Sequence, residues 1–110
     1  HDLRRCLQAP DDTQEPQLQS ITKRVSKYFR LKSTDLRGKT RQQRVVRARG
    51  VAMFLARQLT ASSLETVGRH FGNRDHTTVL HACRKTESLI EEDPSIRQAV
   101  EDLRTELTAN

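Results

Sequence analysis

The chain has 110 residues, and its 20 Lys and Arg against 14 Asp and Glu give a formal net charge of +6. This length fits one domain, and the surplus of positive charge favours a polyanionic partner, with nucleic acid ahead of an anionic membrane surface. The sequence has neither a run of about 18 apolar residues nor a signal peptide, which argues against a membrane-spanning segment.

The first part of the chain has the composition of a linker followed by a helix. Residues 1–17 hold two of the three prolines and few apolar residues after Leu7, which predicts a linker with a short helical stub over 3–7. Apolar side chains then recur every three or four positions, so we expect a helix over 18–31 and a capped turn over 33–36. The residues that form this period are Leu18, Ile21, Val25, Tyr28 and Phe29.

The middle of the chain predicts a basic loop and two helices. The stretch RGKTRQQ, residues 37–43, reads as a loop, and a long helix is expected over 43–59, although Gly50 inside it costs about 1 kcal/mol relative to Ala. Ser62 and Glu65 have the spacing of a capping box, in which the side chain of each residue accepts from the backbone N–H of the other. The helix that they open is expected to run to Phe71 and to stop at Gly72.

The last part of the chain predicts two more helices. After the turn Gly72-Asn73-Arg74, Asp75 can cap a helix to about residue 92 by accepting backbone N–H bonds. Asp93 and Pro94 then cap and open a final helix, whose apolar side carries Ile96, Val100, Leu103 and Leu107. No strand alternation stands out, so the prediction is an all-α fold of about five to six helices.

Residues 72–85, GNRDHTTVLHACRK, allow three interpretations, of which a metal or hydrolytic site is the first. His76 and His81 would point about 140° apart on a helix, and no zinc-ligand spacing or phosphate loop occurs. We therefore expect no metal, no cofactor and no enzymatic activity in this chain. Cys83 falls on the apolar face, so we expect Cys83 and Cys6 to be free thiols, as in a cytosolic protein.

The second interpretation is an ordinary capped helix, and the third is a helix end whose side chains recognise a partner. Val79, Ala82, Thr86 and Leu89 give the helix a core face, but no acid lies between Asp75 and Glu87 on the opposite side. Two helices joined by a short turn with Gly are typical of a helix-turn-helix, in which the start of the second helix meets base edges in the major groove. Asp, His, Thr and Arg side chains suit such contacts.

A second cluster of charge supports a polyanionic partner. The window 36–64 contains no Asp or Glu, although a solvated basic face is the ordinary explanation for a run of like charge. A loop at 37–43 could lay Arg41 into a narrow A·T-rich minor groove, while Lys39 and Arg49 hold phosphates. The seven cations in the window are Arg37, Lys39, Arg41, Arg44, Arg47, Arg49 and Arg57.

The stretch NRDHTTVLHACRK, with RVVRARGVAMFLARQLTASSLETVG before it, resembles a known family. Together they are similar to the C-terminal DNA-binding domain of the bacterial replication initiator DnaA, without a gap over about 20–92. The resemblance implies a Trp-repressor-like helix-turn-helix that binds DnaA boxes of the TTATNCACA type at the replication origin. It also implies a monomeric module at 18–110, with 1–17 as a linker or the end of a preceding ATPase domain.

Carried over by position, the resemblance implies which residues meet DNA. Asp75, His76 and Thr77 would read bases in the major groove, and Arg41 would enter the minor groove. Glu65 and Thr66 stand where the family usually has Pro-Glu, so Glu65 would face the DNA as an acid. The phosphate-binding or supporting positions are Lys39, Gln42, Gln43, Arg49, Arg57, Leu64, Glu65, Arg74, Thr78, His81 and Lys85.

Further departures and wider expectations follow from the same resemblance. Ala48 and Gly50 replace Pro and Gln of the family, and Asn73 replaces a turn glycine whose left-handed conformation Asn tolerates. The partner is expected to be double-stranded DNA in the bacterial cytoplasm and nucleoid. The parent protein is expected to self-assemble on the origin, to bind ATP or ADP only in its absent domain, and to contact acidic phospholipid. The alternatives are a general polyanion binder and a metal-dependent hydrolase.

Overall fold

A computed structural model of the chain describes residues 10–108, and it contains helices and no strand over that range, which confirms the predicted all-α fold. Within residues 10–108 six helices follow one another, and their bounds are α2 Pro10–Tyr28, α3 Ser33–Arg37, α4 Gln43–Leu59, α5 Leu64–His70, α6 His76–Glu92 and α7 Pro94–Thr108. No described helix combines the length and the apolar character that crossing a bilayer would require.

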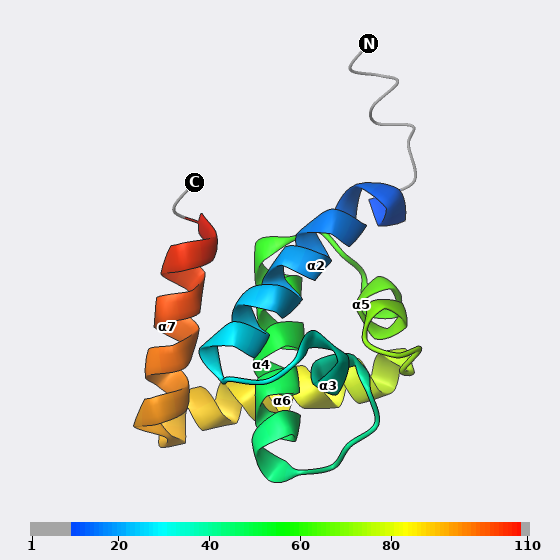
Figure 1. Ribbon diagram of the computed structural model, residues 1–110. Coiled ribbons are helices and arrows are strands. Elements are labelled where there is room, and N and C mark those ends of the chain that lie inside the picture. Colours follow the sequence, from blue (N-terminus) through cyan, green and yellow to red (C-terminus); the bar gives the residue numbers. More distant parts are fainter. Residues whose placement is uncertain (1–9, 109–110) are drawn as a thin grey trace.

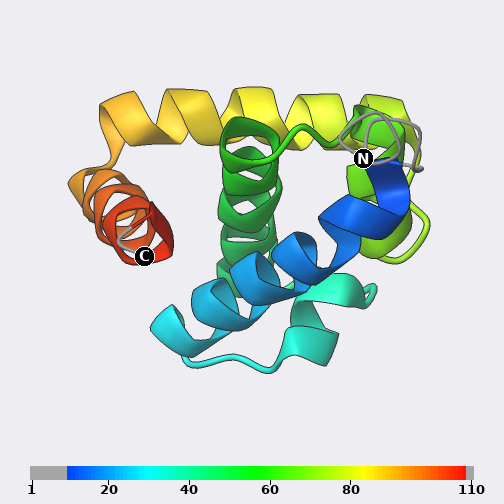
Figure 2. The same ribbon diagram turned by 90° about the horizontal axis from the view of Figure 1, so that it is seen from above.

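Helix α4 is the centre of the molecule (Figure 1). Seen from above, α2 and α6 lie on opposite sides of α4, while α7 and α5 lie at the two ends (Figure 2). Because α4 is packed on several sides, its residues 48–56 are all buried. The largest fully buried side chains come from every described helix and from the end of α5, and they include Leu18, Leu36, Met53, Leu55, Val67, Phe71, Val79 and Leu103.

Helix α2, the first helix within the described residues, is longer than the sequence predicted. It begins at Pro10 rather than at residue 18, so residues 10–17 are helical and not an extended linker. Proline is compatible with the first helical position because its missing N–H has no intrahelical partner there. The predicted stub over 3–7 lies outside the described residues, and the domain boundary near residue 17 stays a prediction.

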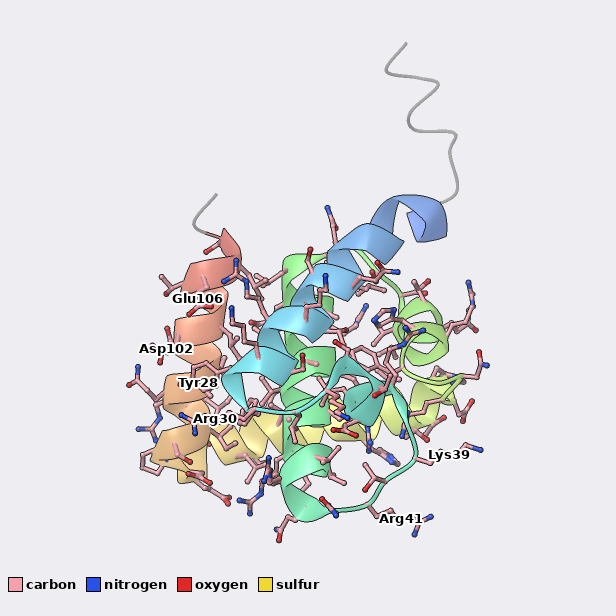
Figure 3. The ribbon with its side chains drawn as sticks, in the orientation of Figure 1. Tyr28, Arg30, Lys39, Arg41, Asp102 and Glu106 are labelled. Carbon is pink, nitrogen blue, oxygen red and sulfur yellow. The ribbon has the colours of Figure 1, made fainter. Side chains whose placement is uncertain are left out.

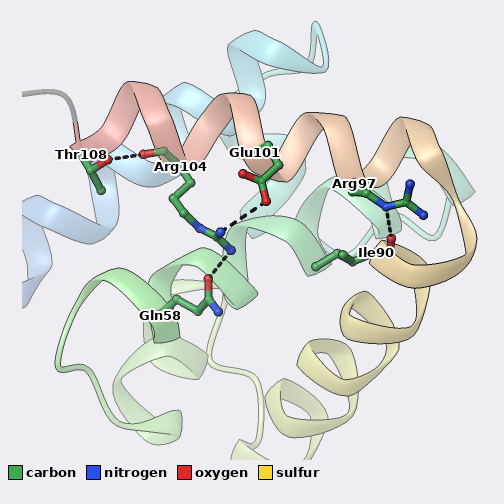
Figure 4. Close-up of polar contacts among 6 residues, drawn as sticks. All are labelled: Gln58, Ile90, Arg97, Glu101, Arg104 and Thr108. Carbon is green, nitrogen blue, oxygen red and sulfur yellow. Dashed lines mark hydrogen bonds and ion pairs between the residues drawn. The ribbon is translucent and has the colours of Figure 1, made fainter.

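Helix α7 is held against its neighbours by polar contacts at its surface. Figure 4 shows Arg104 donating to the Gln58 side chain of α4 at 2.8 Å, while the Arg97 Nε donates to the Ile90 carbonyl of α6 at 2.9 Å. On the other side of α7, the Tyr28 hydroxyl donates to Asp102 at 3.0 Å. These contacts are exposed and each contributes little, so buried aliphatic packing remains the main source of stability.

Gly50 lies where α4 crosses α6, which explains a glycine inside a long helix. A Cβ atom at this position would stand 2.6 Å from the Thr86 Oγ1, and the Thr86 hydroxyl itself donates to the Ala82 carbonyl at 2.9 Å. Helices α4 and α6 therefore approach more closely at Gly50 than any residue with a side chain would allow. The cost that glycine carries for helix stability is offset by this close packing.

We expect Gly50→Ala to lower the free energy of unfolding by about 1–2 kcal/mol, because the new methyl group overpacks the crossing. Thr86→Ala in the same chain should recover most of that loss, since it removes the atom that the methyl group meets. Urea unfolding of both single variants and the double variant gives the coupling energy. Strictly additive effects would contradict the proposed contact.

The start of α5 differs from the prediction in detail. The N-cap is Ser63, whose hydroxyl accepts from the Thr66 N–H at 3.1 Å, and not Ser62. Ser62 is buried, and its side chain accepts from the Thr60 hydroxyl at 2.7 Å. The predicted capping box between Ser62 and Glu65 is therefore wrong, because the preceding turn uses the Ser62 side chain.

Candidate nucleic-acid interface

The turn between α5 and α6 is tight and depends on two left-handed residues. Gly72 has φ +86° and Asn73 has φ 58°, which confirms that Asn tolerates the conformation of a turn glycine here. The Arg74 N–H donates to the Gly68 carbonyl at 2.8 Å, so the turn folds back onto α5. Val67, Phe71 and Val79 are fully buried beneath the turn and fix the angle between the two helices.

The first turn of α6 is open to solvent. Asp75, His76, Thr77 and Thr78 are all exposed, whereas Val79 points into the core. Asp75 holds the N-cap position, but its side chain accepts no capping hydrogen bond, which corrects the predicted cap. Its carboxylate is 70% exposed and lies 3.4 Å from the His76 Nδ1, so it projects from the helix end instead of folding over it.

The rest of α6 has the two faces that the sequence predicted. Val79 and Thr86 are buried, and Ala82, Leu89 and Ile90 are partly buried against the core. His81, Arg84 and Lys85 are exposed on the other face. This helix therefore joins the fold on one side and presents cations and polar groups on the other.

Cys83 is free and partly buried beside the core, as its place on the apolar face predicted. Burial raises the pKa of its thiol, which outweighs the lowering by the nearby Arg57 and disfavours a thiolate ligand or nucleophile. Within residues 17–108, whose side chains are described, no three His, Cys, Asp or Glu residues cluster as a metal site would need.

Loop 38–42, between α3 and α4, lies directly beside the helix-turn-helix. The Arg74 guanidinium donates to the Gly38 carbonyl at 2.5 Å and to the Phe71 carbonyl, and so joins the turn to the start of the loop. The Arg37 Nε donates to the His70 carbonyl at 2.8 Å. Two arginines therefore fasten the loop to the end of α5 through main-chain carbonyls.

A third arginine fixes the loop from inside. Arg49 is only 7% exposed, and its guanidinium donates to the carbonyls of Leu36 at 2.8 Å, Asp35 at 3.1 Å and Thr40 at 3.2 Å. Burial, and then the charge of Arg74, lower the pKa of Arg49, yet a guanidinium stays protonated in proteins. Arg49 thus supports the loop, which is one of the two roles that the resemblance implied for it, whereas the basic window had suggested a direct phosphate contact.

Lys39 and Arg41 are the cations that this arrangement leaves outside. Both are exposed, and in Figure 3 they extend from the loop away from the body of the protein. No carboxylate forms an ion pair with either within the described side chains. A loop that is fixed at its carbonyls can present these cations with little loss of conformational freedom when a partner binds.

The remaining predicted positions surround the same region. Gln42 and Gln43 are exposed at the start of α4, and Glu65 is exposed in the first turn of α5. Leu64 is half-buried, and the Arg57 guanidinium donates to the Ser62 carbonyl at 2.6 Å beside it. Sequence reasoning gave Arg37 no role beyond its charge, because the carbonyl that it binds belongs to a distant helix end.

An exposed helix start beside a short turn, next to a cationic loop, defines a helix-turn-helix DNA-binding domain. The family described as the bacterial DnaA protein helix-turn-helix matches residues 18–86. This chain belongs to that family. The matched residues extend from α2 into α6, so they include the helix-turn-helix and loop 38–42.

Relatives and a solved structure agree with this assignment. Chromosomal replication initiator protein DnaA of Lactobacillus johnsonii is 44% identical over 91 residues, which cover 83% of this chain and 20% of that protein. The protein of the same name from Rhodopseudomonas palustris is 40% identical over 107 residues, 97% of this chain and 22% of that protein. A crystal structure of a DNA replication initiation factor is 32% identical, with a TM-score of 0.75 over 86% of this chain and 29% of that chain. The chain thus spans about a fifth of the length of its curated relatives.

Proposed function

We propose that this chain binds duplex DNA sequence-specifically at DnaA boxes of the TTATNCACA type, as part of replication initiation and its regulation in the bacterial nucleoid. The start of α6 enters the major groove, and loop 38–42 enters the neighbouring minor groove. The observation that carries this proposal is the Arg74 contact to the Gly38 carbonyl, which ties the exposed start of α6 to the exposed cationic loop.

In the major groove, the roles follow from the chemistry of the exposed side chains. The Asp75 carboxylate accepts from a cytosine amino group, and the Thr77 methyl group packs on a thymine methyl. His76 donates to a purine N7, and the Asp75 carboxylate beside its Nδ1 orients the ring for that contact. Such groups distinguish base pairs, since the major groove presents a different pattern for each pair.

Outside the major groove, cations and polar groups hold the duplex in register. Arg41 enters an A·T-rich minor groove, where a narrow groove concentrates negative potential. The phosphate contacts come from both sides of that groove and comprise Lys39, Gln42, Gln43, Arg57, Thr78, His81 and Lys85, with the main chain near Leu64. Arg49 and Arg74 act behind them by holding the loop.

The wider roles concern a longer protein and rest on the likeness to DnaA. Self-assembly on the origin, contact with acidic phospholipid and binding of ATP or ADP belong to the parent protein under this proposal. Glu65 faces the DNA from the exposed start of α5 and weakens binding to any duplex by repelling nearby phosphate.

The proposal is tested by titrating a labelled TTATNCACA duplex and a scrambled duplex of equal length and composition. We expect the box to bind at least about 1,000-fold more tightly at physiological salt, as specific sites do. An RNA duplex and anionic vesicles test the alternative of a general polyanion binder. Equal affinity for the box and the scrambled duplex would contradict sequence-specific binding.

We expect His76→Ala or Thr77→Ala to weaken binding to the box by about 1–3 kcal/mol and binding to the scrambled duplex by much less. Each change removes an exposed side chain, so folding should be unaffected, and circular dichroism checks this. Ser88→Ala is the control, because Ser88 is exposed on the same helix but lies more than two turns beyond His76. Equal losses of affinity for both duplexes would show that these residues contact the DNA backbone and do not read bases.

We expect log affinity to fall with log salt concentration with a slope near −5, which corresponds to about six neutralised phosphates. Binding isotherms between 50 and 200 mM salt, roughly the range over which such slopes develop, give this number. Lys39→Gln should make the slope shallower by about one. A flat response to salt would show that the cations of loop 38–42 do not meet phosphates.

A further inference from the structure

A second cationic surface lies on the side of loop 38–42 that faces away from α5. It is formed by Arg30, Lys32 and Arg44, three exposed residues from the α2–α3 turn and the first turn of α4. They line a hollow of about 450 Å³ that also includes Thr40 and Gln42 of the loop. This hollow is therefore continuous with loop 38–42, but its three cations have no role in the function proposed above.

The three cations are held together by the fold. Arg30 has φ 59°, a left-handed conformation in the turn between α2 and α3. The Arg44 Nη2 then reaches across and donates to the Arg30 carbonyl at 3.3 Å. Residues 14 positions apart in the chain thus converge on one surface, without any contribution from sequence proximity.

The charge of this surface is largely uncompensated. Among the side chains that the structure describes, residues 17–108, no carboxylate forms an ion pair with Arg30, Lys32 or Arg44. Asp35 also lines the hollow, but its carboxylate accepts from the Lys32 backbone N–H at 3.1 Å and closes the first turn of α3. Three cations and one carboxylate give this surface a net positive charge, which favours binding to the phosphate backbone of nucleic acid.

The position of the surface indicates which phosphates it meets. In Figure 3, Lys39 lies on the side of α5, Arg41 lies at the lower end of the loop, and Arg30 lies on the opposite side, toward α7. If α6 begins in the major groove and Arg41 enters the adjacent minor groove, Arg30 and its neighbours lie further along the duplex in the same direction. They would then lie beside the DNA that follows the A·T-rich end of the recognition site.

We propose that Arg30, Lys32 and Arg44 bind backbone phosphates of the DNA that flanks the TTAT end of the box. The proposal rests on the function proposed above, and it extends the binding site beyond the nine base pairs of the recognition sequence. Contacts of this kind add affinity and salt dependence without reading sequence. The flank would therefore contribute whatever its bases are.

The test uses two duplexes that carry the same box. One is extended by roughly five base pairs, about 17 Å at 3.4 Å per pair, beyond TTAT, and the other is extended equally beyond CACA. The native chain should bind the first duplex about three- to tenfold more tightly at low salt, with a steeper salt slope. Equal affinity for the two duplexes would overturn the proposal.

Variants locate the effect in this surface. Arg30→Asn keeps a residue that tolerates positive φ, and Arg44→Gln keeps a donor for the Arg30 carbonyl. Combined, they should abolish the advantage of the TTAT-flanked duplex and reduce its salt slope by about two, while leaving the CACA-flanked duplex unchanged. Thermal unfolding shows whether the double variant is folded.

Two outcomes separate this inference from its alternatives. Lys27→Gln removes one exposed cation from the last turn of α2, and it should not change the preference for either flank. If it reduced binding as strongly as Arg44→Gln, net charge would explain the effect and the surface would have no specific role. Failure to distinguish box from scrambled DNA would defeat the proposed function itself, whereas specific binding without a flank effect would defeat only this inference.

Discussion

Gly68→Ala should lower the free energy of unfolding by about 3 kcal/mol, near the upper end of the range for overpacked cores. A Cβ atom at residue 68 would collide with the carbonyl oxygen of Arg74 and would also stand 3.3 Å from the Val79 Cγ2. The obstacle is main chain, so no rotamer change relieves it. The turn has to open, and the Arg74 N–H loses its bond to the Gly68 carbonyl.

Urea unfolding measures the stability of this variant, and fluorescence anisotropy measures its affinity for the box. Both should fall, because opening the turn moves the start of α6 relative to loop 38–42. Glu65→Ala, an exposed change on the same helix, should alter stability by less than about 1 kcal/mol. Native-like stability in Gly68→Ala would mean that the turn adapts and that α5 and α6 are not held at a fixed angle.

Arg49→Met should lower the free energy of unfolding by about 3–5 kcal/mol, because each buried carbonyl left without a donor costs about 1–3 kcal/mol. Methionine has a similar length and no donor, so the carbonyls of Asp35, Leu36 and Thr40 lose their shared partner. Loop 38–42 should then lose its fixed shape, and affinity for the box should fall with it.

Arg57→Met is the matched control, because Arg57 lies on the same helix but is exposed, and its guanidinium donates to the Ser62 carbonyl. It should cost less than about 1 kcal/mol of stability and reduce the salt slope by about one. Arg49→Lys should be intermediate, since a compact ammonium cannot span three carbonyls. If Arg49→Met were stable and only reduced the salt slope, Arg49 would be a phosphate ligand after all.

The difference between these two arginines shows how far sequence reasoning reached at the site. The charge window and the resemblance placed both Arg49 and Arg57 among the phosphate-binding or supporting residues, and both are guanidinium groups on one helix. Only Arg49 faces α3, whose end leaves carbonyls without helical partners. Which carbonyls need a donor depends on how distant elements pack, and no local pattern carries that information.

The helices themselves were largely predictable. The expected bounds 43–59 for α4 agree with the structure, and the turn at 72–74 separates α5 and α6 as predicted. Periodic apolar residues and punctuation by Gly, Ser and Asp are local signals, which explains this success. The early start of α2 at Pro10 was missed because proline suits both a linker and the first turn of a helix.

The sequence by itself determined an all-α chain with a helix-turn-helix, a basic loop and an excess of positive charge, since each depends on neighbours within a few residues. Only the tertiary structure decided that Arg37, Arg49 and Arg74 turn toward carbonyls while Lys39 and Arg41 face outward. The physical reason is that buried main-chain acceptors must be satisfied. Packing creates those acceptors, and it thereby selects which cations remain available for DNA.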